Sequence, residues 1–297
     1  MPNVRANGIQ IEYETFGDRP SPPLLLIGGY GLQMIGWDEE LCRQWAKKGL
    51  YVIRFDNRDV GLSTKFDEAG IPDAMAAMMA RMKGEKVDAP YTLDDMADDA
   101  VGLLDALGIE KAHLCGMSMG GAIAQTMAIR HPSRVRSMTQ VYATTGNPQL
   151  PLPKPEIMAL LVTPVPEERE AFVDHTVKSY RTFAGPGFAF DEEWHKKYAG
   201  QCYDRAFYPA GLARQYVAIV AHGNRKPALA SVKAPTLVIH GADDPLVPVS
   251  GGKDSAEAIP GAQLMIIEGM GHDLPHRSAW PRIIEAVAAH ARKADGM

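Results

Sequence analysis

The residues with the most direct chemical meaning are Gly116-Met117-Ser118-Met119-Gly120, which fit the pattern G-x-S-x-G. They lie where a predicted strand, 112–115, turns into a predicted helix, 119–130. This context is typical of a nucleophile elbow, a tight turn that exposes a serine hydroxyl at the top of a sheet. Glycine suits both flanking positions because it tolerates close approach and unusual backbone angles. The helix N-terminus favours the negative charge that develops there during attack.

Because a five-residue pattern also recurs by chance, the partners of the serine decide its interpretation. A serine hydroxyl needs a neighbouring base, and that base needs a carboxylate to orient it. In elbow enzymes the order along the chain is serine, acid, histidine. Downstream of the elbow, Asp243 and Asp244 follow a predicted strand as two adjacent carboxylates. His272 follows the next strand, in a glycine-rich loop, so the required order is met with either acid.

Strands and helices alternate along the chain, which predicts an α/β fold with a mostly parallel, doubly wound sheet. The first strand, 9–14, alternates apolar and polar residues after Asn7-Gly8, a strong hairpin-turn sequence. A helix is predicted from Thr92, which forms a capping box variant with Asp95, to Leu107. The sequence predicts six further strands and a last helix opened by Pro281; these strands are 24–27, 51–55, 112–115, 135–142, 236–240 and 264–267. Open α/β sheets bind ligands at the carboxyl ends of their strands. The elbow, the loop with Asp243 and Asp244, and the loop with His272 all follow strands, so they should meet at one edge of the sheet.

Two segments interrupt this alternation. Residues 71–90 carry methionines at helical spacing, namely Met75, Met78, Met79 and Met82. One interpretation is an amphipathic helix packed on the core, and the other is an adaptable apolar flap over the site. Residues 144–228 begin with several prolines and are rich in aromatic residues. We expect them to form a helical lid inserted between two parts of the core, residues 1–143 and 229–297.

The composition excludes several classes of function. The net charge of −5 gives no reason to expect a nucleic acid or an anionic membrane as partner. No apolar run is long enough to span a membrane, and the N-terminus lacks the apolar stretch of a signal peptide. Three widely spaced cysteines, Cys42, Cys115 and Cys202, predict reduced thiols in a cytoplasmic protein. No residue spacing suggests a metal site or a phosphate-binding loop, so we expect no cofactor; the sequence does not indicate the oligomeric state.

Four segments together resemble the α/β-hydrolase superfamily over nearly the whole chain: 25–31, 55–63, the elbow, and the two downstream loops. The chain is most similar to the bacterial esterase and aclacinomycin-methylesterase-like group. In that family's pattern the acid is the third residue after the strand-end glycine, which implies Asp244 rather than Asp243. The resemblance also implies that the segment 55–63, with its D-x-R-D-x-G-x-S residues, is structural.

An oxyanion hole is expected from the backbone N–H of Met119 and one N–H of the loop 28–31. We favour Tyr30 as the second donor, with Gly29 as its alternative. Many relatives carry a histidine where this chain has Gly28, but the exchange leaves backbone donors intact. Among the histidines, His240 is interpreted as a packing residue that could touch Asp244. Three lid histidines could approach substrate: His175, His195 and His222.

These observations predict a carboxylic ester hydrolase that works through an acyl-enzyme on Ser118. His272 would act as the base and Asp244 would orient it. The lid aromatics predict a small-molecule ester with an apolar moiety as substrate. A lactonase, a perhydrolase or a carbon–carbon bond hydrolase would use the same residues, since fold does not fix chemistry. An alternative of a different class is a small-molecule receptor on the same scaffold without turnover.

Overall fold

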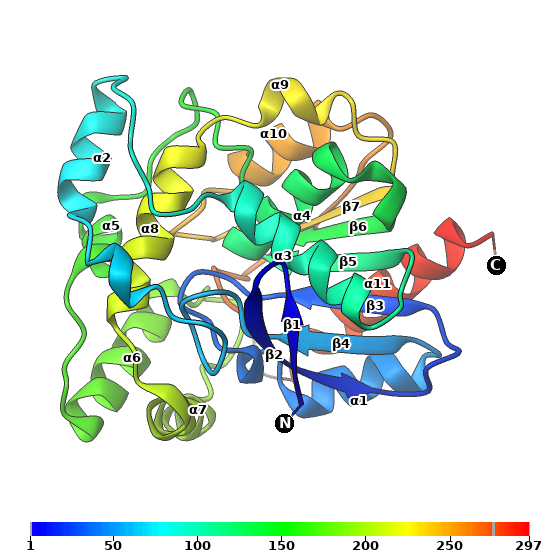
Figure 1. The fold of residues 1–297 in the computed structure, drawn as a ribbon, viewed down its shortest axis with the longest axis horizontal. Helices are drawn as coiled ribbons and strands as arrows, with labels where there is room; N and C mark the ends of the chain where they lie inside the picture. The colour runs from blue at the N-terminus through cyan, green and yellow to red at the C-terminus, as the bar shows by residue number, and fades with distance from the viewer. Residues whose placement is uncertain (1, 275–276, 297) are drawn as a thin grey trace.

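The computed structural model describes residues 2–274 and 277–296, and within them eight strands form one sheet (Figure 1). The strand order is β1-β2-β4-β3-β5-β6-β7-β8. β1 and β4 both pair with β2 in antiparallel fashion, and every later neighbour pair is parallel. The strands are β1 (Asn3–Ala6), β2 (Ile9–Phe16), β3 (Pro23–Ile27), β4 (Tyr51–Phe55), β5 (Ala112–Met117), β6 (Val135–Val141), β7 (Thr236–Gly241) and β8 (Gln263–Ile267). The predicted mostly parallel sheet is therefore confirmed.

The turn between β1 and β2 confirms the hairpin expected at Asn7-Gly8. Ala6 pairs directly with Ile9, so only two residues form the turn. Both adopt positive φ angles, 47° for Asn7 and 80° for Gly8. A two-residue turn of this kind matches the twist of the flanking strands.

The continuous apolar runs form strands that are covered on both faces. In β3, Leu25 and Ile27 join a cluster with α3 and α4, whereas Leu24 and Leu26 join a second cluster with α1 and α11. Figure 1 shows these helix pairs on opposite sides of the sheet. The principal helices are α1 (Glu39–Lys47), α2 (Ala74–Met82), α3 (Leu93–Ala106), α4 (Met119–Arg130), α5 (Pro155–Val162), α6 (Arg169–Phe183), α7 (Glu192–Ala206), α8 (Ala210–His222), α9 (Lys226–Leu229), α10 (Ser250–Ala258) and α11 (Trp280–Ala294). The alternation of side chains along a strand therefore gives the sheet its two apolar faces.

Helix α3 begins and ends as its sequence predicts. The Thr92 hydroxyl accepts a hydrogen bond from the helix backbone, and the Asp95 carboxylate accepts one from the Thr92 N–H at 2.7 Å. This reciprocal pair satisfies two N–H groups that the first helical turn leaves free. At the other end, Gly108 adopts φ 67° and ends the helix.

The segment between β6 and β7 carries α5 to α8, which Figure 1 shows together at the left of the molecule, opposite the C-terminal end of α11. Helix α6 packs on α7, and α8 packs on α2. Helices α5 and α6 bury one residue each, Ile157 and Val177, whereas α7 and α8 bury several, among them Tyr198 and Tyr216. Helices α5 and α6 thus lie at the surface, whereas α8 reaches the interior, where Ala218 joins the same cluster as Leu25 and Ile27.

Helix α2 forms where the methionines are spaced, but it does not bury them. Met75, Met79 and Met82 are 46%, 51% and 70% exposed, and Ala77 is the buried residue of the helix. The interpretation as a helix packed on the core is therefore wrong for these three side chains. The reason is that α2 packs against α8 rather than against the sheet.

The described part of the chain holds no helix that is long and apolar enough to cross a bilayer. Cys42, Cys115 and Cys202 are buried free thiols. Burial raises the pKa of each of these thiols, to about 12 for Cys42 and Cys202. They are therefore thiols rather than reactive thiolates, in line with a packing role.

Candidate active site

Ser118 lies in the turn between β5 and α4, in a strained conformation. Its φ of 52° and ψ of −118° lie in a region that side chains with a Cβ rarely adopt. The Ser118 N–H donates to the carbonyl of Val141 at 2.9 Å, which ties the turn to the end of β6. Strain of this kind persists only where the surroundings impose it, and it is common at functional sites.

The two glycines of the pattern are required by close backbone contact. A Cβ on Gly116 would overlap the carbonyl oxygen of Gly120, and a Cβ on Gly120 would overlap that of Ile27. Helix α4 therefore passes directly against the ends of β5 and β3. Its residues from Met119 to Ala128 are all buried, as expected of a helix covered on every side.

His272 joins Ser118 to Asp244 in one line of hydrogen bonds. Its Nε2 lies 2.9 Å from Ser118 Oγ, and its Nδ1 lies 2.7 Å from Asp244 Oδ2. The His272 backbone N–H donates to the carbonyl of Phe183 at 2.8 Å. His272 and Asp244 are 8% and 6% exposed, so both are shielded from water. The structure thus brings together the three side chains that the sequence singled out.

Asp244, rather than its neighbour Asp243, is the acid that contacts the histidine. Asp244 Oδ1 accepts hydrogen bonds from the N–H groups of Leu246 and Val247 at 2.9 and 2.7 Å. Burial acts to raise the pKa of Asp244, but the His272 charge and the hydrogen bonds to the carboxylate outweigh it and lower the pKa to about 2. Asp243 Oδ2 instead accepts the Gly269 N–H at 2.9 Å, at the protein surface.

His240 extends this group of polar side chains. It is fully buried, and its Nε2 lies 2.8 Å from the carbonyl of Val247 and 3.5 Å from Asp244 Oδ2. The contact with Asp244 that the sequence left open therefore exists. It adds a second imidazole beside the carboxylate that His272 uses.

Asp273, directly after His272, is a buried carboxyl group that the sequence did not single out. It is 9% exposed, lines the same pocket, and its Oδ1 has no hydrogen-bond partner in the described part of the protein. Burial raises the pKa of Asp273 to about 6, although the nearby His272 charge opposes the shift. The ring centroids of Tyr142 and His272 lie 4.4 Å apart.

The predicted oxyanion donors lie beside the serine. Met119 is the first residue of α4, so its N–H has no acceptor within the helix. In the loop after β3, Gly31 N–H donates to the side chain of Gln215 and Leu32 N–H to the carbonyl of Gly29. No backbone hydrogen bond of the described residues uses the Tyr30 N–H. A Cβ on Gly29 would lie 3.4 Å from that of Ser118, so this loop borders the serine.

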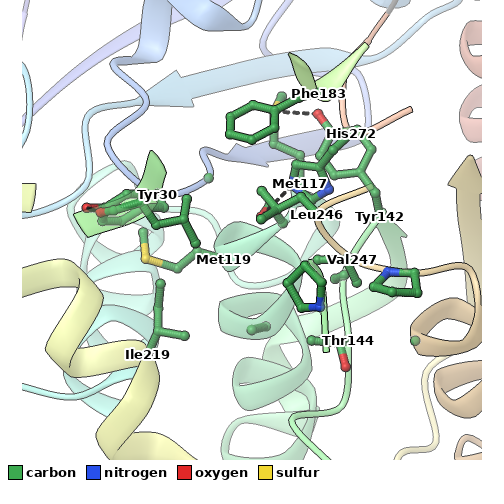
Figure 2. A pocket seen from close by; sticks show the side chains of 18 of the residues that line it. Tyr30, Met117, Met119, Tyr142, Thr144, Phe183, Ile219, Leu246, Val247 and His272 are labelled. Carbon is green, nitrogen blue, oxygen red and sulfur yellow. Dashed lines mark hydrogen bonds between the residues drawn. The ribbon is translucent and has the colours of Figure 1, made fainter. Parts of the chain in front are cut away.

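A pocket of about 880 Å³ opens onto Ser118 and His272. Figure 2 shows Tyr30 and Met119 on one side of it, facing Leu246 and Val247. Helices α6, α7 and α8 contribute the aromatic side chains Tyr180, Phe183, Trp194, Tyr198 and Tyr216. The end of α2 contributes Arg81 and Met82. A pocket of this size and lining fits a small organic molecule with apolar parts.

Sequence comparison decides the family. Residues 22–277 match the family described as alpha/beta hydrolase fold. The chain belongs to this α/β-hydrolase family.

Curated relatives of this α/β hydrolase cover nearly its full length. Rhodomycin D methylesterase DauP of Streptomyces sp. strain C5 is 30% identical, and the match covers 95% of this chain and 94% of that protein. The 3-oxoadipate enol-lactonase 2 of Acinetobacter baylyi is 26% identical, with 96% and 95% covered. Among solved structures, the meta-cleavage product hydrolase CumD of Pseudomonas fluorescens IP01 superposes with a TM-score of 0.75 at 21% identity, covering 99% and 98%. These relatives are hydrolases, which confirms the expectation of a hydrolytic enzyme.

The segment 55–63 of the α/β hydrolase provides buried ion pairs. Arg58 pairs with Asp99 at 2.6 Å, and Asp59 pairs with Arg214 of α8 at 2.8 Å. Asp56 pairs with Arg205 of α7 at 2.7 Å. These contacts support the structural role that the resemblance implied.

The remaining predicted histidines have different surroundings. His195 lines the pocket and stacks on Phe190, with ring centroids 4.2 Å apart. His222 lies beside Thr126 and is not among the residues that line the pocket. Burial lowers the pKa of His175 and also that of His222, the latter to about 4. No group of residues suited to hold a metal ion occurs in the ranges that the structure describes.

Proposed function

We propose that this protein is a carboxylic ester hydrolase with Ser118 as its nucleophile. The observation that carries the proposal is the hydrogen-bonded line from Ser118 through His272 to Asp244, open to an apolar pocket. Hydroxyl, imidazole and carboxylate in this order form the arrangement that activates serine in acyl transfer. The methylesterase named above is a relative of matching length, which favours an ester as the substrate.

In the proposed reaction, Ser118 Oγ attacks the ester carbonyl carbon while its proton passes to His272 Nε2. The carbon–oxygen bond to the alcohol then breaks, and His272 returns the proton to the leaving oxygen. Water, deprotonated by His272, then attacks the acyl carbon; the bond to Ser118 Oγ breaks, His272 returns the proton to that oxygen, and the acid is released. Asp244 holds the His272 ring in place and stabilises its cationic form.

We propose the N–H groups of Met119 and Tyr30 as the oxyanion donors. Support comes from the helix start at Met119 and from the engagement of the neighbouring N–H of Gly31 with Gln215. Gly29 remains the alternative second donor in the same loop. A missing donor typically costs ~3–4 kcal/mol of transition-state stabilisation.

We propose that residues 144–228 act as a lid on a core made of residues 1–143 and 229–297. The support is that α6, α7 and α8 supply most of the aromatic wall of the pocket. Substrate choice would then depend on this segment, since the core supplies the chemistry. Of the exposed methionines of α2, Met82 lines the same pocket.

We also propose a cytoplasmic location. The support is chemical: three free thiols persist in a chain that forms no disulfide among them. Proteins of oxidising compartments use cysteine mainly in disulfides.

A lactone is the second candidate substrate class. The enol-lactonase relative covers 96% of this chain, and a lactone is an intramolecular ester that the same residues can open. A parallel assay of lactones and open-chain esters at equal concentration distinguishes the two. A higher kcat/KM for the lactones would favour this candidate over the open-chain esterase.

The direct activity test replaces Ser118 by Ala and measures hydrolysis of p-nitrophenyl esters. Turnover should fall by more than ~10³-fold because the nucleophile is lost. Ser133→Ala, at an exposed serine just beyond the other end of α4, is the matched control and should keep full activity. Comparable turnover in Ser118→Ala would contradict the proposal. A receptor without turnover would release at most one equivalent of product from the wild-type protein.

A further inference from the structure

Two guanidinium groups lie at the part of the pocket formed by α2 and the loop before α9. Arg225 comes directly before α9 and is 6% exposed, and Arg81 comes at the end of α2. Both line the pocket that contains Ser118. They flank Gly223, where an added Cβ would lie 3.0 Å from the Arg81 guanidinium.

The contacts of Arg225 are all to neutral acceptors. Its Nε donates to the Gln125 side chain at 2.9 Å, its Nη2 to the carbonyl of Thr144 at 2.8 Å, and its Nη1 to the carbonyl of Gly223 at 3.3 Å. A guanidinium has five N–H groups, so these bonds leave two without an acceptor. In the ranges that the structure describes, no carboxylate forms an ion pair with Arg225 or Arg81.

This arrangement differs from that of the other deeply buried arginines. Arg58 and Arg214 each hold a carboxylate with two hydrogen bonds, Asp99 and Asp59 respectively. A buried charge without a partner is unfavourable, and burial lowers the pKa of Arg225 to about 10. Among the described residues, the buried Arg225 cation therefore has no carboxylate partner, and it borders the pocket that contains Ser118.

Nearby carboxylates are already engaged elsewhere. Asp254 pairs with Lys226 at 2.7 Å and accepts hydrogen bonds from Thr145 and Asn147. The same wall of the pocket offers a further free polar group, since the buried Ser250 hydroxyl oxygen has no partner among the described residues. Arg225 and Ser250 both line the pocket, and each has a hydrogen-bonding group that the described residues leave unused.

The distance to the nucleophile follows from α4. Gln125, which holds Arg225, lies seven residues after Ser118 in the sequence. Seven residues of α-helix rise ~10 Å. In Figure 2, Thr144, whose carbonyl accepts a hydrogen bond from Arg225, lies at the opposite end of the view from Phe183 and His272.

We propose that the pocket binds an ester that carries a carboxylate ~10 Å from the scissile carbonyl, with Arg225 and Arg81 as the anion-binding groups. This inference rests on the proposed esterase function and specifies its substrate class. The apolar and aromatic wall would contact the part of the substrate between the ester and the carboxylate. Arginine suits this task because its fork of donors matches a carboxylate.

The test compares esters that differ only at the distant end. On the acyl side, p-nitrophenyl monoesters of straight-chain dicarboxylic acids are compared with their terminal carboxamide analogues, at several chain lengths. On the alcohol side, acetate esters of ω-hydroxy acids are compared with their carboxamides. In at least one arm, wild-type kcat/KM should favour the carboxylate by about 10- to 100-fold at the matching length, the range expected for hydrogen bonds to a charged group.

Variants then assign the preference to the arginines. In Arg225→Met the carboxylate-to-carboxamide ratio should fall toward 1, and Arg225→Lys, which keeps the charge but not the fork, should retain part of it. Arg81→Met should lower the ratio by less, because Arg81 is more exposed. Arg5→Met, at an exposed arginine on β1, is the control and should leave the ratio unchanged. Thermal melting confirms that each variant is folded. The carboxylate-to-carboxamide ratio of the wild-type protein tests the proposal without any variant.

The outcomes separate this inference from the proposed function. If neither the carboxylate nor the carboxamide ester is hydrolysed, the esterase proposal fails, and the inference with it. If both are hydrolysed at similar rates at every length in both arms, only the inference is overturned. It is also overturned if the wild-type preference persists in the double variant Arg225→Met/Arg81→Met.

Discussion

Asp243 and Asp244 are adjacent carboxylates in different surroundings, and this difference gives a matched pair of variants. Asp244 is buried and bonded to His272 at 2.7 Å, whereas Asp243 accepts one N–H at the surface. Asp244→Asn should lower kcat by ~10³–10⁴-fold, because an amide favours the wrong tautomer of the histidine. Asp243→Asn should have little effect. Steady-state kinetics on one p-nitrophenyl ester compare the two, and equal losses would mean that Asp244 has no special role.

Asp273 gives a prediction about pH and stability. Burial raises the pKa of Asp273 from 3.8 to about 6, so between these values the folded protein binds more protons than the unfolded chain. The contribution of Asp273 to stability is therefore most favourable near pH 4 and is lost as pH rises through 6. Replacing Asp273 by Asn should raise stability at pH 7.5 by up to ~3 kcal/mol and change it little at pH 4.

Urea unfolding of wild type and Asp273→Asn at the two pH values measures this difference. Tyr142, Tyr180, His272 and Asp244 all face the carboxyl group and are the same in both proteins. A stability difference of equal size at both pH values would show that the effect is packing rather than ionisation.

At this residue scale, sequence alone identified some groups and missed others. Ser118 and His272 lie in short glycine-rich patterns, so local sequence was enough to predict them. The choice of Asp244 over Asp243 needed the family resemblance. Arg225 and Asp273 were missed because their significance depends on what does not surround them, and only the packed structure shows a missing partner.

At the scale of elements, the elbow depends on how closely α4 approaches β3. A methyl group on Gly120 would overlap the carbonyl oxygen of Ile27, although Gly120 has an ordinary helical φ. Gly120→Ala should therefore destabilise the protein by ~3 kcal/mol, at the upper end for overpacking.

Gly261→Ala is the control for this prediction. Gly261 has φ 71° but open space around it, so its substitution should cost only ~1–2 kcal/mol for the left-handed backbone. Chemical denaturation with both variants gives the comparison. A smaller loss for Gly120 than for Gly261 would contradict the account of the elbow.

Whether sequence alone predicts an element depends on whether local or long-range contacts stabilise it. Helix α3 and the hairpin at Asn7-Gly8 carry their own local determinants, and the sequence predicted both. Helix α2 is held by α8 and not by the sheet, so its spacing of methionines predicted a helix but not which face is buried.

At the scale of the whole molecule, buried ion pairs join the helices around the pocket to the core. Arg214 of α8 and Asp59 are 1% and 0% exposed at their side chains. Asp59→Asn would leave the guanidinium without its partner, at a cost of ~3–5 kcal/mol. Asp204→Asn breaks an exposed pair with Arg169 and should change Tm little.

Hydrogen exchange locates the effect of Asp59→Asn. Exchange should accelerate in α8 more than in β5 and β6, because the broken pair anchors α8. Uniform acceleration over the molecule would mean that the pair stabilises the fold as a whole and does not specifically hold α8.

The sheet was predictable because most of its parallel strands are apolar runs, and because the hairpin combines the Asn7-Gly8 turn with a strand that alternates apolar and polar residues. The arrangement of α5 to α8 was not predictable, because it depends on long-range contacts such as the Asp59–Arg214 pair, which the local sequence does not reveal. Helices α6 to α8 supply much of the pocket wall. The shape of the pocket is therefore set by the part of the chain that the sequence predicts least well.

The central claim, that Ser118 is the nucleophile, is tested most directly by covalent trapping. A phosphonate with a p-nitrophenol leaving group should add one equivalent to the wild-type protein, with the added mass on the peptide that contains residues 116–120. Ser118→Ala should take up none, and His272→Ala should react far more slowly because the base is lost. Modification of another residue, or equal modification of Ser118→Ala, would contradict the assignment of Ser118.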